Sequence, residues 1–386
     1  MDFRLTDDQR ELQDAARSFA RGELPSIAAQ LERDNVPPPR ALVKRYAAMG
    51  FLGINVSENL GGLGLGNLEA LIVLEEFAKI SSAVAFPIFE SMVGPVRAVE
   101  HFASDELKQR IVPQVSAGEM IVAVAMSEPD AGSALTDLTT RGVLRGDTVV
   151  LNGTKRWCSG GGHADAYVVY CRLSDDPGAK GIGAVLVEKD APGLSFGPNE
   201  HLMGFRGIPS ADLNFDDCEV SAANVILPAG GFKKLMEAFD LERCGNATMA
   251  LGQASGALED VLVYVQERKQ FGKPLAEFQA VQLKLAEMQM KVEAARLLIW
   301  RAAVNAQEGL PSMLDSSLGK CFANSIAREV TGDAMQLMGA YGYSKEFPIE
   351  RRLRDSWGWG IAGGAIDIQK VNIASAMLGR RFDQRR

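Results

Sequence analysis

Apolar positions recur at helical spacing through the first part of the chain, up to about residue 120. The first stripe follows a Thr-Asp-Asp-Gln run at residues 6–9, which is typical of a capped helix start. Its apolar members are Leu5, Leu12, Ala15, Ala16 and Phe19. Similar patterns predict helices over residues 41–49, 67–80 and 91–102, with turns such as Gly61-Gly62 between them. We therefore expect an N-terminal helical domain over residues 1–120.

The pattern changes near residue 121, where short apolar runs bounded by turn residues replace the helical stripes. The run at 121–125 predicts a strand, and the strand at 148–151 meets Asn152-Gly153, a dipeptide typical of tight hairpins. Further strands are expected over residues 166–173, 181–187 and 211–215. The pattern favours an antiparallel β domain over residues 121–229.

Helical periodicity returns at Phe232 and continues towards the C-terminus. One stripe alternates spacings of four and three residues, which is typical of a helix packed along its length in a bundle. Its members are Val281, Leu285, Met288, Val292, Ala295 and Ile299. The sequence thus predicts an α+β protein with a C-terminal four-helix bundle over residues 230–386. Alternating βαβ units are missing from this order, so a Rossmann domain is not expected, and Gly62, Gly64 and Gly66 are interpreted as a loop.

Composition narrows the function classes. The 386 residues carry a net charge of −8 without long charged runs, which disfavours nucleic-acid binding. Five scattered cysteines and three distant histidines argue against a disulfide framework and against a metal site. The charged N-terminus lacks the apolar core of a signal peptide, and no apolar run approaches the roughly 20 residues that span a membrane. We expect a cytoplasmic protein.

The segment from Met126 to Ser133 is the first candidate for binding chemistry. Pro129, Asp130 and Gly132 favour a turn after the strand at 121–125, which leaves backbone N–H groups unpaired. Such a loop could hydrogen-bond the polar edge of a ring ligand, although a plain surface turn has the same composition.

Four segments, taken together, resemble the acyl-CoA dehydrogenase family in the same chain order. Residues 126–133 match its Thr/Ser-Glu-Pro-x-Ala-Gly-Ser motif, and residues 152–160 match its Asn-Gly-x-Lys-x-Trp segment. Residues 267–279 resemble the Arg-x-x-Phe-Gly signature and its following Gln, and residues 336–342 resemble the Gln-x-x-Gly-Gly-x-Gly loop. The resemblance covers nearly the whole chain and implies the family's three-domain fold with FAD as cofactor.

The resemblance implies a set of FAD-binding residues. In the family, the first two segments lie beside the flavin, Arg268 contacts the pyrophosphate, and the loop after Gln336 reaches the FAD of a neighbouring subunit. The implied positions are Met126, Ser127, Gly132, Ser133, Trp157, Ser159, Arg268, Gln270, Phe271, Phe278, Gln279, Gln336, Gly339, Ala340, Ala365 and Asp367. The chain departs from the family pattern at Ala134, at Ser159 in place of threonine, and at Ala340 in place of glycine.

The catalytic base is the main departure. Many family members carry a glutamate after an Arg-Asp motif, but here the count from Arg354-Asp355 places Gly363 at that position. Relatives such as isovaleryl-CoA dehydrogenase carry it on an earlier helix, directly before an arginine, and Glu242-Arg243 matches that pattern. We expect Glu242 to be the base, although an arbitrary Glu-Arg pair on a helix is usually an exposed, paired charge.

The resemblance also implies the substrate contacts. The Gly363 N–H is expected to donate to the thioester oxygen, which makes Gly363 a catalytic position without a side chain. The implied substrate-binding residues are Ser133, Asp240, Arg243, Ala362 and Gly363. Because Ala362 and Gly363 are small, we expect room for a branched, cyclic or aryl acyl group. Trp357 and Trp359 either line this cavity or pack in the core.

The function expected from the resemblance is α,β-dehydrogenation of an acyl-CoA, with electrons passed to an electron-transfer flavoprotein by a homotetramer arranged as a dimer of dimers. Two alternatives stay open at this stage. The vacant position 363 also fits a catalytically silent subunit of a mixed assembly, and a flavin monooxygenase can share the fold. The acyl chain and the choice between CoA and carrier-protein thioesters are not specified by the sequence.

Overall fold

The N-terminal region of the computed structural model, which describes residues 3–307 and 309–382, is built from helices. Thr6 and Gln9 form the expected capping box at the start of the first helix. The helix predicted over 91–102 is confirmed for residues 96–102, but it is not continuous, because the chain breaks between two helices at Val93-Gly94-Pro95. A Cβ on Gly94 would lie 2.7 Å from the Glu90 carbonyl oxygen, so the chain turns where only glycine fits. The helices are α1 (Asp7–Asp34), α2 (Arg40–Ala48), α3 (Asn67–Ala78), α4 (Ser82–Met92), α5 (Val96–Phe102) and α6 (Asp105–Ser116).

The middle region contains an eight-stranded sheet in the described part of the chain, with the order β6-β7-β3-β2-β4-β5-β8 and β1 beside β4. Most neighbours are antiparallel, as expected, but β1 and β2 each pair with β4 in parallel. The strands are β1 (Val122–Ala125), β2 (Arg141–Arg145), β3 (Thr148–Ser159), β4 (Ala166–Arg172), β5 (Ile182–Glu188), β6 (Leu194–Phe196), β7 (Ser210–Ser221) and β8 (Val225–Leu227).

The hairpin predicted at Asn152-Gly153 is wrong. Strand β3 runs straight through this dipeptide, and the pairing with β7 shifts register there. The Asn152 side chain hydrogen-bonds Asp217 on β7, while a Cβ on Gly153 would lie 2.6 Å from the Thr140 hydroxyl oxygen. Glycine is therefore needed for close approach of a neighbouring segment, and the turn lies at 146–147 instead.

The C-terminal region is a bundle of long helices in which α7, α8, α9 and α11 pack together. The predicted stripe on α8 is confirmed, since Met288, Val292, Ala295 and Ile299 are buried and the other two members pack against the same core. The elements are α7 (Phe232–Glu267), β9 (Lys269–Gln270), β10 (Lys273–Pro274), α8 (Gln279–Asn305), α9 (Met313–Met338), α10 (Ala340–Tyr343), α11 (Ile349–Trp359) and α12 (Ile366–Met377). Single 3-10 turns cover Glu58–Leu60, Leu135–Asp137, Gly178–Gly181, Ala222–Asn224 and Leu275–Glu277.

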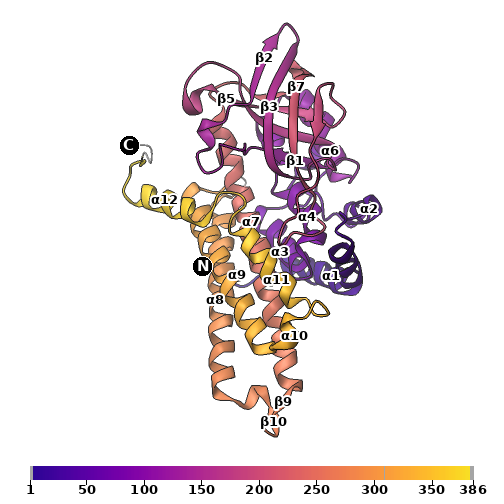
Figure 1. Ribbon diagram of the computed structural model, residues 1–386, viewed down its shortest axis with the longest axis vertical. Coiled ribbons are helices and arrows are strands. Elements are labelled where there is room, and N and C mark those ends of the chain that lie inside the picture. The colour runs from indigo at the N-terminus through magenta and orange to yellow at the C-terminus, as the bar shows by residue number, and fades with distance from the viewer. Residues whose placement is uncertain (1–2, 308, 383–386) are drawn as a thin grey trace.

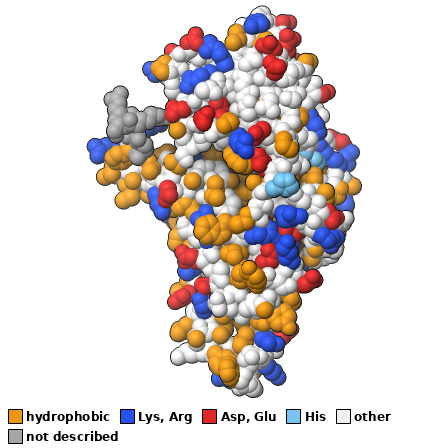
Figure 2. All heavy atoms as spheres, viewed as in Figure 1, with side chains coloured by type: hydrophobic (Ala, Val, Ile, Leu, Met, Phe, Trp, Pro, Cys, Tyr) orange, Lys and Arg blue, Asp and Glu red, His pale blue; other side chains and the backbone are white. Residues whose placement is uncertain are grey.

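The arrangement confirms the predicted α+β fold class of helices, sheet and helical bundle. Figure 1 shows the sheet at one end of an elongated molecule, and the β9-β10 hairpin at the far end of the bundle. Helix α7 extends from the hairpin end of the bundle up to the sheet, so it links the two ends (Figure 1). Apolar side chains gather on the surface around α12, as Figure 2 shows. No helix among the described residues is long and apolar enough to cross a membrane.

Candidate active site

A buried ion pair anchors the Met126–Ser133 loop. The Lys155 ammonium on β3 lies 2.8 Å from a Glu128 carboxylate oxygen and donates at 2.9 Å to the Met126 carbonyl. The Glu128 carboxylate also accepts from the backbone amides of Thr139 and Thr140. Burial alone would raise the pKa of Glu128, but these donors hold it at about 2. The pair is therefore a permanent structural feature that fixes the loop against the sheet.

The outer part of the same loop is left open. Gly132 and Ser133 are exposed, and a Cβ on Gly132 would meet nothing within 4 Å. Their backbone amides are not used by the hydrogen bonds found in the described part of the chain. The loop thus presents free donors next to the Ser127 and Ser133 hydroxyls, which suits the polar edge of a ring ligand.

Trp157 lies beside this loop near the end of β3. Its backbone has φ +61°, a conformation that places the indole outside the pleat, and the side chain is 52% exposed. The Arg156 guanidinium lies 4.4 Å from the Trp157 ring centroid and is held by Glu200 and Asp212. An exposed indole fixed in this way offers an aromatic surface next to the free amides, and this fits an isoalloxazine ring.

Glu242 projects from α7 and remains half-buried. Burial raises the pKa of Glu242 to about 8, against the opposing charges of Lys320 and Arg243. No hydrogen bond or ion pair of the carboxyl is found within the described residues. An acid in this state loses its proton near neutral pH and has a free oxygen to accept another, which are the properties of a general base.

The charge of Glu242 acts on two further titratable groups. The carboxyl of Glu90 on α4 is buried, and one of its oxygens lacks a partner within the described residues. Burial, followed by the charge of Glu242, holds the pKa of Glu90 well above its ordinary value. Burial, and again Glu242, also raises the pKa of Tyr170 on β4. Glu242 therefore shares its surroundings with two groups that stay neutral near pH 7.

Asp240 and Arg243 pair with each other one turn apart on α7. The Ser316 hydroxyl of α9 donates to the same Asp240 oxygen at 2.8 Å. Both charged side chains are buried, and the Arg243 Nε has no partner within the described residues. The pair lies directly beside Glu242 in sequence and leaves one guanidinium donor available.

The turn after α11 brings Gly363 to the same region. Gly363 has φ +64° and Gly364 has φ +85°, so this turn favours glycine at both positions. A Cβ on Gly363 would meet the Asn246 amide nitrogen at 3.2 Å and the Lys320 ammonium at 3.7 Å. Asn246 follows Glu242 by one helical turn on α7, so the predicted base and the predicted N–H donor border one polar cluster.

The two tryptophans of α11 have different roles. Trp359 is buried, donates from Nε1 to the Ser82 hydroxyl at 3.0 Å, and packs against Phe205 at a ring distance of 4.7 Å. Trp357 is 46% exposed beneath the Arg328 guanidinium, 4.2 Å from its ring centroid. Trp359 therefore belongs to the core, whereas Trp357 lies at the surface of the bundle.

A second group of predicted site residues lies at the other end of the bundle. Arg268 is exposed and lies 5.8 Å from the Tyr341 ring centroid, which places the segment after α7 beside the segment after α9. Phe271 is 94% exposed, and Gly339 has φ +59° with open space around it. Figure 1 shows this hairpin end opposite the sheet. One chain thus brings together Arg268, Gln270, Phe271, Phe278, Gln279, Gln336, Gly339 and Ala340, but not with Trp157.

Ala365 and Asp367 lie at the start of α12. Ala365 is the N-cap residue of this helix, and Asp367 is exposed and pairs with Lys370 at 3.1 Å. Helix α12 packs on α9. These two positions therefore lie near the Gly363 turn and apart from the Arg268 group.

Sequence reasoning missed four residues of this region, namely Glu90, Lys155, Asn246 and Lys320. Asn246 could have been found from its spacing of four residues after Glu242, since that spacing shares a helix face. For the other three, the sequence does not show which groups surround the charged side chain, because that depends on which helices and strands meet.

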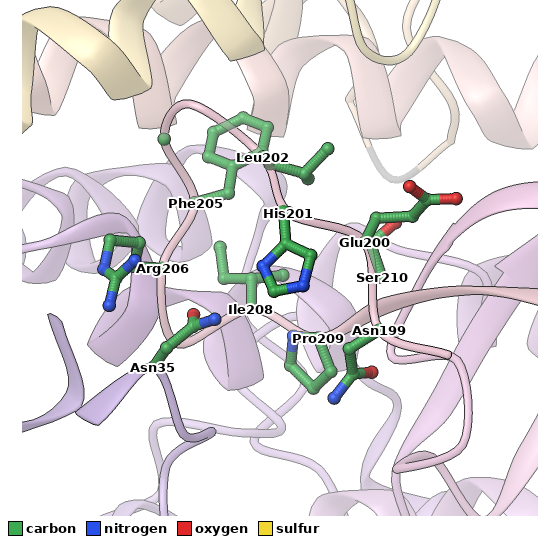
Figure 3. Close-up of a pocket in the computed structure, with 11 residues that line it drawn as sticks. Asn35, Asn199, Glu200, His201, Leu202, Phe205, Arg206, Ile208, Pro209 and Ser210 are labelled. Carbon is green, nitrogen blue, oxygen red and sulfur yellow. The ribbon is translucent and has the colours of Figure 1, made fainter. Parts of the chain in front are cut away.

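A pocket of about 70 Å³ lies apart from these residues, between the loop at 199–210 and Asn35. Figure 3 shows His201 and Asn35 at this pocket, with the Glu200 carboxyl turned away from it. Glu200 instead pairs with Arg156 at 2.9 Å. The pocket contains none of the predicted catalytic residues, so it is not the candidate active site.

Comparisons with known proteins agree along the whole chain. The family models for the N-terminal, middle and C-terminal domains of acyl-CoA dehydrogenase match residues 6–119, 123–218 and 229–378. A 3-sulfinopropanoyl-CoA desulfinase from Paraburkholderia xenovorans (strain LB400) is 38% identical over 100% of this chain and 99% of that protein. An acryloyl-CoA reductase (NADH) from Anaerotignum propionicum is 39% identical over 98% of this chain and 97% of that protein.

Two solved structures have the same fold. Butyryl-CoA dehydrogenase from Megasphaera elsdenii is 32% identical, with a TM-score of 0.94 over 98% of this chain and 100% of that chain. A chain from the structure of the electron transferring flavoprotein of Acidaminococcus fermentans is 36% identical, with a TM-score of 0.95 over 98% of this chain and 100% of that chain.

Proposed function

Since this chain belongs to the acyl-CoA dehydrogenase family, we propose that it oxidises an acyl-CoA to the 2-enoyl-CoA with Glu242 as the base. The observation that carries this proposal is the state of Glu242, a half-buried carboxyl that has no partner among residues 3–307 and 309–382 and whose pKa is raised to about 8. In the late segment, where many family members carry the base, this chain has Gly363.

The cofactor of the family is FAD, which supplies the two-electron acceptor for the β-hydride when it is bound. In this chain the Gly132 and Ser133 amides, with the Ser127 hydroxyl, would hold the polar edge of the ring. Trp157 would cover part of the ring, and Ser159 would donate to it from the end of β3. The buried Glu128–Lys155 pair supports this role because it fixes the loop before any ligand arrives.

In the proposed reaction Glu242 takes the α-proton of the acyl chain. Ionised Glu242 can accept that proton because its carboxyl makes no competing hydrogen bond within the described residues. Loss of the α-proton builds negative charge on the thioester oxygen, and the Gly363 N–H would donate to it. The unused donor of Arg243 would bind a polar group of the substrate near the base.

The acyl group would lie beside the turn of Ala362 and Gly363. The absence of a glutamate side chain leaves space there, but Asn246 and Lys320 border that space within 4 Å of a Cβ at position 363. We therefore propose a short or compact acyl group rather than a long straight chain. Branched, cyclic and aryl groups remain candidates.

A second copy of the chain would complete the cofactor site. Arg268 and the Gln336–Ala340 segment lie at the opposite end of the bundle from Trp157, so they would serve the FAD of a neighbouring subunit (Figure 1). Exposed apolar residues around α12, such as Met377 and Leu378, favour association of copies. We propose a homotetramer, arranged as a dimer of dimers, that passes electrons to an electron-transfer flavoprotein. The similarity to a chain from an electron transferring flavoprotein structure supports that acceptor.

An anaerobic screen tests the proposed function. The purified flavoprotein is mixed with straight, branched, cyclic and aryl acyl-CoAs. Loss of the flavin absorbance band at about 450 nm is recorded. We expect at least one compact acyl-CoA to bleach the flavin and to yield the 2-enoyl-CoA. Absence of bleaching with every acyl-CoA, in protein that retains FAD, would contradict the proposal and favour a silent subunit.

A second candidate reaction is removal of the sulfinate group from 3-sulfinopropanoyl-CoA. It is supported by the 38% identity to a desulfinase over the full length of both chains. Release of a sulfur oxyanion without bleaching would favour this candidate. Oxygen consumption by the reduced protein, with an oxygenated product, would instead favour the flavin monooxygenase.

A further inference from the structure

Lys320 is a buried lysine in the middle of α9, and its side chain is fully inaccessible to solvent. The Nζ donates at 2.7 Å to the Ala362 carbonyl, at 2.8 Å to the Asn246 amide oxygen and at 3.3 Å to the Trp359 carbonyl. Asn246 in turn donates to the same Ala362 carbonyl at 3.2 Å. Two side chains from different helices therefore hold one carbonyl of the turn that follows α11.

The geometry of the peptide bond gives this contact a consequence. The Ala362 carbonyl and the Gly363 N–H belong to one planar trans peptide, so they point in opposite directions. When Lys320 and Asn246 bind the carbonyl oxygen, the Gly363 N–H must point away from them. That N–H is not used by the hydrogen bonds found among the described residues. The turn thus presents a fixed, free donor.

Lys320 also carries charge into this region. Four acceptors surround its nitrogen, because the Asn324 amide oxygen also lies 3.4 Å away, and the ammonium form has the most hydrogens to donate to them. Burial, followed by the like charge of Arg243, lowers the pKa of Lys320 well below its ordinary value, while the charge of Glu242 opposes this shift and favours the ammonium. Within the described residues no carboxylate forms an ion pair with Lys320. Glu242 is therefore the carboxylate whose ionised form this ammonium can favour.

The other groups around Glu242 do not replace that charge. Arg243, on the same helix, is paired with Asp240. Glu90 on α4 and Tyr170 on β4 cannot carry a positive charge, and the pKa of each is raised. The groups compared lie on α4, α7, α9 and β4. Among them, Lys320 on α9 is the cation that has no anionic partner within the described residues.

We propose that Lys320, with Asn246, is a positioning residue that aims the Gly363 N–H at the substrate and places a positive charge about one helical turn of α7 from Glu242, on the side chain of Asn246. The first half rests on the proposed dehydrogenation, because it assigns the N–H to the thioester oxygen. The second half concerns the chain alone. One buried side chain would therefore act on both the proton acceptor and the oxyanion donor.

The test uses two variants of the full-length flavoprotein and one control. Lys320→Met removes the charge and the clamp while keeping most of the volume. Asn246→Leu removes the bridging amide but keeps the charge. Lys44→Met, in an exposed ion pair with Glu119, is the matched control. FAD content and thermal unfolding are measured for each protein before any other readout.

Two readouts separate the two halves of the proposal. The first is the infrared C=O band of the neutral Glu242 carboxyl, assigned by its loss in Glu242→Gln and titrated with pH. The second is the rate of anaerobic bleaching by an acyl-CoA. We expect Lys320→Met to raise the infrared midpoint by about one pH unit and to slow bleaching about tenfold or more. Asn246→Leu should slow bleaching with a midpoint shift below about half a unit.

The outcomes distinguish the possibilities. A folded Lys320→Met protein with the wild-type midpoint and wild-type bleaching rate would overturn the proposal. If that variant does not fold, unchanged bleaching by Asn246→Leu overturns the clamp, and slower bleaching with retained FAD supports it. If the wild-type protein is not bleached by any acyl-CoA, the proposed function fails, but the infrared midpoint still tests the effect of Lys320 on Glu242.

Discussion

Glu128 and Glu242 each lie near a buried lysine, and they differ in almost every other respect. Glu128 touches Lys155 at 2.8 Å and accepts further hydrogen bonds from backbone amides, and its pKa falls to about 2. The charge of Lys320 acts on Glu242 without an ion pair or hydrogen bond between them. Glu242 accepts no hydrogen bond among the described residues and has a pKa of about 8. The same two residue types thus give a permanent ion pair in the sheet and a titrating acid in the bundle.

The difference shows that direct contact decides the role. A carboxylate that contacts its lysine keeps its charge and becomes part of the scaffold. A carboxyl that is kept away from its lysine retains a free oxygen and a proton affinity near that of a working base. In this chain Asn246 and the Ala362 carbonyl occupy the Lys320 donors that Glu242 would otherwise use.

The largest effect is expected when Glu242 loses its ability to accept a proton. Glu242→Gln should slow anaerobic bleaching by about 10²- to 10⁴-fold, the range typical for loss of a general base, while FAD stays bound. Glu237→Gln, at a position five residues earlier on α7, is the matched control and should bleach normally. Bleaching by Glu242→Gln at the wild-type rate would place the base elsewhere.

The next effect tests the scaffold role of the other pair. Lys155→Met would leave the Glu128 carboxylate buried without its cation, which costs about 3–5 kcal/mol in comparable sites. We expect a matching loss in the free energy of unfolding, measured in urea, and weaker retention of FAD. Lys233→Met removes an exposed lysine of α7 and serves as the control. Unchanged stability and FAD content in Lys155→Met would refute the scaffold role.

Stability should depend on pH with opposite signs at the two glutamates. The pKa of Glu128 is depressed in the fold, so its stabilisation is present above about 4.5 and is lost as pH falls towards 2. The pKa of Glu242 is raised, so ionising it costs stability as pH rises from about 4.5 towards 8.

Melting temperatures of the two Gln variants across pH check these signs. As pH rises from about 5 to 8, the free energy of unfolding of Glu242→Gln should increase relative to that of wild type, by up to roughly a few kcal/mol. Glu128→Gln should be less stable than wild type above about pH 4.5, and the difference should shrink in acid. Parallel curves for all three proteins would contradict both assignments.

The smallest effect is expected at Glu90. Burial and the neighbouring Glu242 keep the Glu90 carboxyl protonated in the neutral pH range, so Gln at this position replaces one neutral group by another. Glu90→Gln should therefore move the pH midpoint of bleaching by less than about half a unit. A fall of a unit or more would mean that Glu90 is ionised beside Glu242.

Sequence patterns predicted the structure correctly where it depends only on residues within the same helix. The α8 stripe and the capping box at Thr6 were predicted correctly, because both depend on residues within one or two turns. The Asn152-Gly153 hairpin failed because Asp217 and Thr140, far away in the chain, decide the conformation there. Local propensity is overruled at such contacts.

The candidate site shows the same division. Glu242 was found from its place before Arg243, but its protonation state depends on α9 and α4, which no local pattern specifies. Lys320 lies on the same buried face of α9 as Ala323 and Ala327, but most of its acceptors come from α7, from the end of α11 and from the turn after it. Chemistry that depends on the meeting of several helices becomes visible only in the fold.

The pH dependence of bleaching by the wild-type flavoprotein tests the central claim most directly. The second-order rate constant at low acyl-CoA reports the free protein, so it titrates with the base before substrate binds. If Glu242 is the base, this constant rises with pH and reaches half its maximum near pH 8. A half-maximum near the ordinary glutamate value of 4.5, or a constant that does not change between about pH 6 and 9, would contradict the account.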